Sequence, residues 1–195
     1  ETRKEFDRAL LISATGTGKT YLSAFDVKQA KAKKILFVAH RKVILERSKI
    51  SYQRILKNKK MEIFDNNFQI NGKDEVVFAM VQTLNKEKNL NIFPKDYFDY
   101  IIIDEVHHGG AKTYQSIFEY FKPKFLLGIT ATPERTDDFN IYQLFNYNVA
   151  YEIRLQDAMK EELLCPFHYF GISDIVIDGE SIDEKTSIKN LTSDK

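Results

Sequence analysis

The 195-residue sequence contains only one cysteine, Cys165, and its formal net charge is only +1. A single cysteine excludes a disulfide within the chain. Low cysteine usage is typical of a reducing compartment, so we expect a cytoplasmic location. No apolar run approaches the roughly 18 residues that a transmembrane helix needs. The first ten residues, ETRKEFDRAL, carry charges where a secretory signal has its apolar core. We therefore expect no membrane partner.

The near-neutral total hides an uneven distribution of charge. Residues 28–60 contain twelve lysines and arginines and a single acid, Glu46. Such a basic block can form a surface that faces a polyanion. It can equally be a solvated, lysine-rich helix face, and the block alone does not separate these two interpretations.

Short apolar runs alternate with segments that have helical periodicity. The apolar runs lack polar alternation, which is typical of strands buried on both faces of a parallel sheet; they are residues 9–13, 34–39, 75–80, 99–104 and 125–130. Helices are predicted between them at residues 19–31, 41–57, 83–89 and 113–121. This order predicts an α/β fold, a mostly parallel sheet with helices on both faces.

The remaining segments are less regular. Residues 58–74 are predicted to form an irregular loop, with a turn at NGKD. Later in the chain we expect a strand at 149–153, a short helix at 154–164 and a strand at 167–172. The polar C-terminal stretch resembles a linker. We therefore predict one domain over residues 1–163, and a linker or the start of a second domain over residues 164–195.

The segment ISATGTGKTY, at residues 12–21, follows the first predicted strand and opens the first predicted helix. It matches the phosphate-binding Walker A pattern except at its first position, where Ser13 replaces glycine. Glycines let backbone N–H groups approach phosphate oxygens, the lysine reaches the β and γ phosphates, and the threonine hydroxyl can bind Mg²⁺. An ordinary glycine turn is the alternative. The expected nucleotide-binding residues are Thr15, Gly16, Thr17, Gly18, Lys19 and Thr20.

A second motif favours the nucleotide-binding interpretation. The run YIIIDEVHH, at residues 100–108, is a predicted strand that ends on Asp104 and Glu105. A P-loop ATPase needs one carboxylate to hold Mg²⁺ and another to orient and deprotonate the attacking water. Asp104 suits the first role and Glu105 the second. With Lys19, these two acids are the expected catalytic residues.

Residues 104–107 (DEVH) form a DExH box, and residues 130–132 read TAT. Together they resemble the superfamily 2 helicases and translocases. FVAHR, at 37–41, is similar to motif Ia of that superfamily, and MVQTL, at 80–84, occupies the place of the next strand-end contact with nucleic acid. DEVHHGGAKTY, LGITATPERTDD and EELLCPFHYFGI resemble the bacterial DEAD/DEAH-box proteins grouped with the type III restriction enzyme helicase subunit. The resemblance covers roughly residues 9–171.

This resemblance implies a RecA-like P-loop domain that uses ATP and Mg²⁺ and moves along nucleic acid, DNA in preference to RNA. It implies that three residues couple the nucleotide state to nucleic acid, namely His107, Thr130 and Thr132. It places four residues near the nucleic-acid strand: His40, Arg41, Gln82 and Thr83. The basic block then has a function, because lysines and arginines that contact phosphates bind nucleic acid without sequence preference.

The 195 residues depart from the family pattern in two ways. No glutamine-bearing adenine motif precedes the phosphate loop, and motifs of the second RecA-like domain, including its arginine finger, do not occur. The resemblance implies that ATP lies between two such domains, so we interpret the chain as a first motor domain whose partner is the second domain of the same protein. The isolated chain is expected to be nearly inactive as an ATP hydrolase.

Several functions remain open at this point. Within the motor class, the sequence does not separate a helicase from a translocase, a restriction-enzyme motor subunit or an RNA helicase. A nucleotide-sensing module that binds ATP without useful hydrolysis belongs to a different class, and Glu105 argues against it because a sensor has little need of a catalytic base. A small-molecule kinase fits the DExH box and TAT motif less well.

Overall fold

The computed structural model describes residues 5–65, 67–70, 72, 75–108, 111–133, 140–165, 176–177 and 180–181. The chain divides into two compact units, residues 1–164 and residues 165–195. In the second unit, β8 (Val176–Ile177) and β9 (Glu180–Ser181) pair antiparallel. The strand predicted at 167–172 lies outside the described residues. No helix in the described part of the chain is long and apolar enough to cross a membrane.

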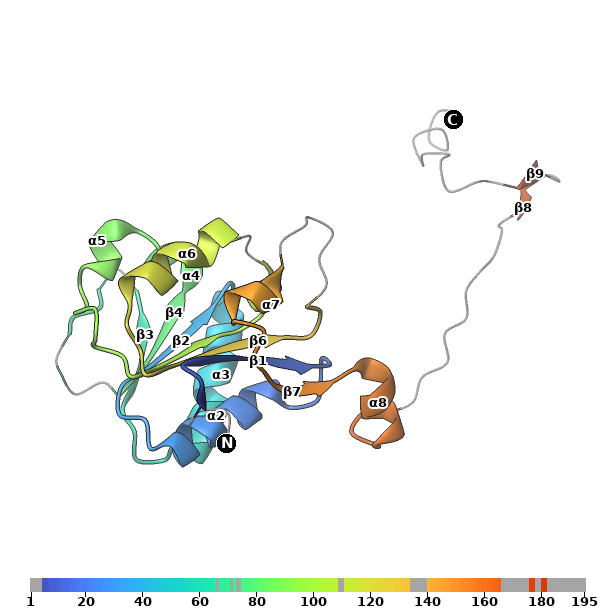
Figure 1. The fold of residues 1–195 in the computed structure, drawn as a ribbon, viewed down its shortest axis with the longest axis horizontal. Helices are drawn as coiled ribbons and strands as arrows, with labels where there is room; N and C mark the ends of the chain where they lie inside the picture. The colour runs from blue at the N-terminus through green and yellow to red at the C-terminus, as the bar shows by residue number, and fades with distance from the viewer. Residues whose placement is uncertain are drawn as a thin grey trace, which may run out of the picture. The chain divides into compact units, whose positions relative to one another are not determined.

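The first unit is built on a seven-stranded sheet whose strand pairs are all parallel, in the order β3-β4-β2-β5-β6-β1-β7 (Figure 1). The strands are β1 (Arg8–Ser13), β2 (Ile35–Ala39), β3 (Met61–Phe64), β4 (Val76–Met80), β5 (Tyr100–Ile103), β6 (Phe125–Thr130) and β7 (Val149–Ile153). All five predicted apolar strands and the predicted strand at 149–153 are confirmed.

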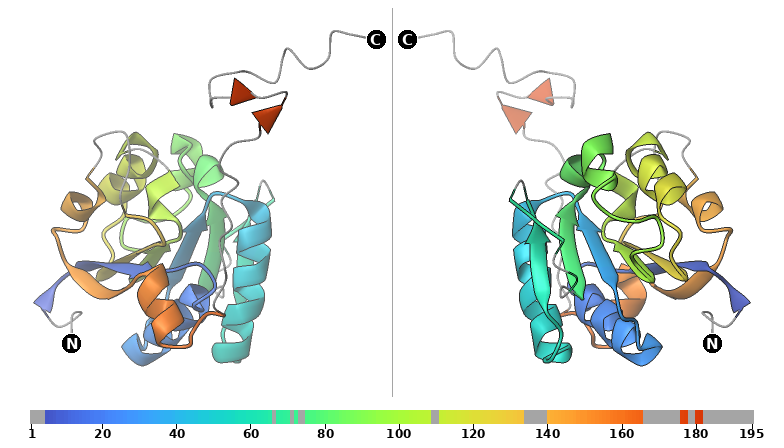
Figure 2. Two further views of the ribbon diagram at one scale, coloured as in Figure 1. Left: turned by 90° about the vertical axis from the view of Figure 1, so that its right-hand side faces the viewer. Right: turned by 90° about the vertical axis from the view of Figure 1, so that its left-hand side faces the viewer.

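Helices cover both faces of the sheet, as predicted (Figure 2). One face carries α2 (Lys19–Ala30) and α3 (Lys42–Ile55), and the other carries α4 (Val81–Leu84), α5 (Glu87–Leu90), α6 (Ala111–Tyr120) and α7 (Ile141–Leu144). A 3₁₀ turn, η1 (Val106–His108), follows β5, and α8 (Leu155–Lys160) follows β7.

Burial on both sides explains why the strand sequences do not alternate. In β2, Leu36 and Val38 pack into the core under α6, whereas Ile35, Phe37 and Ala39 pack into the core under α2 and α3. Each fully buried Val, Leu, Ile or Phe side chain stabilises the fold by roughly 1.5–3 kcal/mol. The apolar strands therefore hold the sheet edge that positions the polar residues following them.

Two details differ from the sequence prediction. The loop predicted at 58–74 is wrong for Met61–Phe64, which forms β3 beside β4. This strand is short and lies at the sheet edge, with Glu62 exposed, so it lacks the continuous apolar run of the central strands. The helix predicted at 83–89 is two separate turns, α4 and α5, and α7 was not predicted.

Candidate functional site: the carboxyl edge of the sheet

The segment between β1 and α2 has the backbone of a phosphate-binding loop. Gly16 and Gly18 have φ angles of 91° and 85°, in the left-handed region that favours glycine. A Cβ added to Gly18 would meet nothing within 4 Å, so the requirement there is conformational and not steric. No side chain caps the N-terminus of α2. Its first N–H groups are therefore available to an anion.

Ser13, the departure from the Walker A pattern, closes the loop instead of disrupting it. Its hydroxyl lies 2.5 Å from the hydroxyl of Thr17, which in turn donates to the Ala14 carbonyl at 2.7 Å. Since the Thr17 proton is used on that carbonyl, Ser13 is the donor of the first bond. Thr17, predicted to bind nucleotide, thus uses its hydroxyl within the loop, while Thr15 is exposed.

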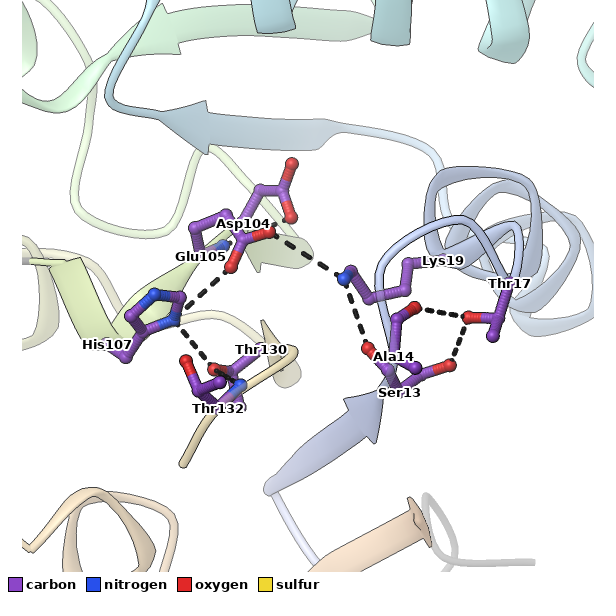
Figure 3. Close-up of polar contacts among 9 residues, drawn as sticks. All are labelled: Ser13, Ala14, Thr17, Lys19, Asp104, Glu105, His107, Thr130 and Thr132. Atoms are coloured by element: carbon purple, nitrogen blue, oxygen red, sulfur yellow. Dashed lines mark hydrogen bonds and ion pairs between the residues drawn. The ribbon is translucent and has the colours of Figure 1, made fainter. Parts of the chain in front are cut away.

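Lys19 lies between the loop and the DExH box (Figure 3). Its ammonium group donates to the Ser13 carbonyl at 3.0 Å and lies 3.7 Å from Glu105 Oε1. The lysine side chain is 10% exposed and the glutamate side chain 23%, so little solvent screens this pair. The fold therefore brings together the phosphate-loop lysine and the predicted catalytic base, which are far apart in the sequence.

Glu105 has an unusual backbone and a side-chain oxygen without a hydrogen bond. Its φ is 50°, a left-handed conformation that costs a non-glycine residue about 1 kcal/mol or more. Its Oε2 atom is buried and lies 3.2 Å from His107 Nδ1, yet accepts no hydrogen bond from the described residues. A buried carboxylate oxygen with an unused lone pair suits a group that accepts a proton from a water.

His107 connects the DExH box to the TAT motif. Its Nδ1 atom lies 2.7 Å from Thr130 Oγ1, and the same hydroxyl oxygen accepts the backbone N–H of Thr132 at 3.2 Å (Figure 3). Thr130 is fully buried at the end of β6. The three residues predicted to couple nucleotide and nucleic acid are therefore linked by hydrogen bonds, next to Glu105.

Asp104 is buried at the end of β5, with 7% of its surface exposed. Burial, with a further contribution from neighbouring Glu105, raises the pKa of Asp104 to about 6, although Lys19 and the Glu105 N–H act in the opposite direction. A bound cation would offset both causes. Among the described residues no cluster of three or more His, Cys, Asp or Glu forms a metal site. A P-loop Mg²⁺ needs none, because its protein ligands are one hydroxyl and one carboxylate, which the sequence predicts to be Thr20 and Asp104.

A cavity of ≈ 540 Å³ lies at the carboxyl edge of the sheet; it is lined by Thr15, His40, Arg41, Ile44, Glu105, His107, Ala131 and Thr132. A second cavity, of ≈ 520 Å³, lies on the α2 side of the sheet and is mostly apolar. Ser13 and Thr17 are among the residues that line this second cavity, but neither Asp104 nor Glu105 lines it. The first cavity is therefore the one that Glu105 and His107 of the DExH box line.

The four residues predicted to lie near nucleic acid occupy two places. His40 and Arg41 follow β2 and line the cavity beside Glu105. Gln82 and Thr83 lie in α4, which follows β4, the next strand in the sheet, and they do not line that cavity. Gln82 is exposed, and the Thr83 carbonyl accepts a hydrogen bond from the Asn89 side chain. All four lie beyond the carboxyl ends of parallel strands.

The basic block of residues 28–60 is not one surface. Because α2 and α3 run back across the sheet, eight of its twelve basic residues lie toward the amino edge, away from the cavity: Lys28, Lys31, Lys33, Lys34, Arg54, Lys57, Lys59 and Lys60. Some of these residues form ion pairs or hydrogen bonds at that edge; for example, Lys59 Nζ lies 2.7 Å from Glu75 Oε1. Arg41 and Lys42, at the start of α3, are the exposed cations at the carboxyl edge. The sequence could not separate the two groups, because the chain direction of each element decides it.

Two contacts of the site had no local sequence signal. One is the Ser13–Thr17 hydroxyl pair, and the other joins His40 to Tyr114 of α6, whose hydroxyl lies 2.6 Å from His40 Nε2. The second pair is 74 residues apart in the chain. Only the parallel arrangement of β2 and β5 brings it together.

Comparison with known proteins identifies the family. The family model "Type III restriction enzyme, res subunit" matches residues 1–135. The chain is 30% identical over 190 residues to a type I restriction enzyme EcoAI endonuclease subunit of Escherichia coli, covering 88% of this chain and 22% of that protein. It is 33% identical over 159 residues to a protein of Acanthamoeba polyphaga mimivirus named as an ATP-dependent RNA helicase, covering 80% of this chain and 29% of that protein.

Among solved structures, the fold is similar to a nuclease-deletion mutant of the type ISP restriction-modification enzyme LlaGI in complex with a DNA substrate mimic. The TM-score is 0.64 at 19% identity, over 82% of this chain and 19% of that one. The chain thus spans less than a third of each of these three proteins. Its seven-stranded parallel sheet is that of RecA-like helicase ATPase cores. The chain belongs to the restriction-enzyme res-subunit family of superfamily 2 helicases.

Proposed function

We propose that this chain is the ATP-binding motor domain of a DNA helicase or translocase, and that it couples ATP hydrolysis to movement along duplex DNA. The observation that carries the proposal is the continuous set of contacts from Lys19 through Glu105 and His107 to Thr130. The set joins a phosphate site to the cavity that His40 and Arg41, two of the expected nucleic-acid residues, also line. A protein that only stored or sensed nucleotide would not need this connection.

Each residue of the set has a role that follows from its position. With ATP bound, Lys19 would exchange the Ser13 carbonyl for phosphate oxygens, and the uncapped start of α2 would supply N–H donors. Thr20 and Asp104 would hold Mg²⁺, which neutralises charge that develops on the phosphates. Glu105 Oε2, which accepts no hydrogen bond from the described residues, would take the proton of the attacking water.

We propose DNA as the nucleic acid along which the protein moves because of the restriction-enzyme relatives. The Escherichia coli relative is an endonuclease subunit, and the LlaGI structure contains a DNA substrate mimic. The name of the mimivirus relative favours RNA as the second candidate. Binding of one labelled 30-base-pair duplex, in competition with unlabelled DNA and RNA duplexes of the same sequence, separates the two. Stronger competition by the RNA duplex would favour the second candidate.

The catalytic half of the proposal is tested by Glu105→Gln in the full-length protein. We expect hydrolysis to fall by a factor of at least 100 while ATP binding remains, since the glutamine cannot accept the proton. The isolated 195-residue chain should hydrolyse ATP barely, because an arginine from a second RecA-like domain contributes on the order of 10³–10⁵ in rate in such enzymes. Binding of ATP without any hydrolysis by the full-length protein would favour the nucleotide-sensing alternative.

A further inference from the structure

Helix α6 is linked by side chains to both predicted nucleic-acid segments. The helix begins at Ala111, shortly after the DExH box. Its residue Tyr114 is fully buried, and the tyrosine hydroxyl lies 2.6 Å from His40 Nε2, at the end of β2. The two rings also meet edge to face, with centroids 5.7 Å apart and planes at 61°. His40 is thereby held by a residue of α6.

A second link lies two residues further along the same helix. The Ser116 hydroxyl donates to the side-chain oxygen of Asn85, the residue that ends α4. Helix α4 contains Gln82 and Thr83, and the Thr83 carbonyl is held by Asn89 at 2.6 Å. Thus α6 contacts the segment after β2 through Tyr114 and the segment after β4 through Ser116.

Packing alone does not explain a tyrosine at position 114. A phenylalanine would fill the same volume, and burying a hydroxyl without a partner costs about 1–3 kcal/mol. The Tyr114 hydroxyl meets a side chain that lines the functional cavity. By contrast, the Tyr120 hydroxyl of the same helix donates to the Phe93 carbonyl at 2.7 Å, away from that cavity. The two tyrosines therefore provide a test residue and a matched control.

We propose that Tyr114 is a positioning residue, supported by Ser116, that fixes the two strand-end segments to the helix following the DExH box. The inference rests on the proposed function, because it takes His40–Arg41 and Gln82–Thr83 as the nucleic-acid contacts. A rigid helix with side-chain bonds to both segments makes the hydrolytic residues and the nucleic-acid face move as one body. In this proposal Tyr114 affects nucleic-acid binding by positioning His40 and does not itself contact the nucleic acid.

Amide hydrogen exchange of the 195-residue chain tests the structural part. Tyr114→Phe keeps the ring and removes one hydrogen bond, worth about 1 kcal/mol net, so exchange in residues 40–45 should rise about fivefold. Tyr120→Phe should leave those amides unchanged. The same melting temperature in both variants would show that the fold is retained. Unchanged exchange at residues 40–45 in Tyr114→Phe would overturn the proposal.

A double-mutant cycle with His40→Ala, read by the affinity of the same chain for a 30-base-pair DNA duplex at low salt, tests the functional part. Tyr114→Phe alone should weaken binding about threefold to fivefold, and it should add nothing in the His40→Ala background, because its effect passes through His40. Additive losses would indicate a merely structural role and overturn the proposal. A wild-type chain that bound no nucleic acid would count against the proposed function, and the exchange result alone would then decide whether Tyr114 holds the segment.

Discussion

The ammonium group of Lys19 lies 3.7 Å from Glu105 Oε1 and 3.0 Å from the Ser13 carbonyl. The lysine thus pairs with the carboxylate predicted to be the catalytic base and holds the end of β1 beside the start of α2. Both contacts compete with phosphate for the same ammonium group. Under the proposed function, ATP binding would replace the Ser13 carbonyl and the Glu105 carboxylate by phosphate oxygens as partners of Lys19, and the affinity would measure the difference between these interactions.

Lys19→Ala should weaken ATP·Mg²⁺ binding by at least the ~1.5–3 kcal/mol that charged hydrogen bonds contribute. The fold should remain, because β1 and α2 are held by apolar contacts. Titration calorimetry on the 195-residue chain measures the difference. Lys28→Ala, an exposed lysine in the last turn of the same helix, is the control and should bind like the wild type. Equal affinities of the wild type and Lys19→Ala would remove Lys19 from the site.

Asp104→Asn should stabilise the nucleotide-free protein at high pH. The pKa of Asp104 is about 6 in the folded state and near 4 in an unfolded chain, so the folded state binds more protons between these values. The contribution of Asp104 to the free energy of unfolding of the wild type therefore falls as the pH rises from about 4 to about 6. It does not recover above pH 6. Asparagine has no such loss, so the gain of the variant should be about 1–3 kcal/mol at pH 8 and less than about 1 kcal/mol at pH 4.5.

Urea unfolding of the Asp104→Asn variant and the wild type at both pH values gives this difference directly. Titrating groups far from Asp104 affect the two proteins equally, so the change in the difference with pH reports on Asp104 and its interaction with Glu105. The same variant should bind ATP·Mg²⁺ less tightly, since it replaces a carboxylate ligand of the cation. A gain of equal size at pH 4.5 and pH 8 would contradict the raised pKa.

Reversing Arg41 and Lys42 to glutamate should weaken binding to duplex DNA of any sequence and flatten its dependence on salt, because two cations that meet phosphates are lost. The structure supplies a control of equal charge, Lys31→Glu with Lys57→Glu, at the amino edge of the sheet. Affinities measured from low to moderate salt should change mainly in the first variant. Equal losses in both variants would mean that net charge, and not the carboxyl edge, governs binding.

The central strands and the polar residues at their ends were predictable because a short segment of sequence contains the signal for each. A run such as YIIID marks both a buried strand and the carboxylate that follows it, and parallel pairing then places Asp104 near Lys19. The edge strand β3 was not predictable in this way, since MEIF has one exposed and two buried positions in four residues. Its strand conformation depends on pairing with β4, which is a tertiary fact.

The contacts between the site residues were less predictable than the identity of those residues. The resemblance placed Lys19, Glu105, His107 and Thr130 at one site, yet no pattern in the sequence shows which atoms meet. Side chains such as Tyr114 resemble ordinary core residues until the sheet order brings His40 above them. Residue types can therefore indicate the chemistry, whereas the positioning of those residues follows from strand order and helix direction.

Thr130→Val should uncouple hydrolysis from nucleic acid in the full-length protein. Valine fills nearly the same buried volume but cannot bond His107 Nδ1 or accept the Thr132 N–H. His107 then loses a hydrogen bond worth about 1 kcal/mol, while its proximity to Glu105 remains. Steady-state hydrolysis with and without duplex DNA should show a several-fold smaller stimulation, while calorimetry shows ATP binding within about twofold of the wild type. An unchanged ratio of stimulated to basal rate would mean that the His107–Thr130 bond is structural and that coupling follows another route.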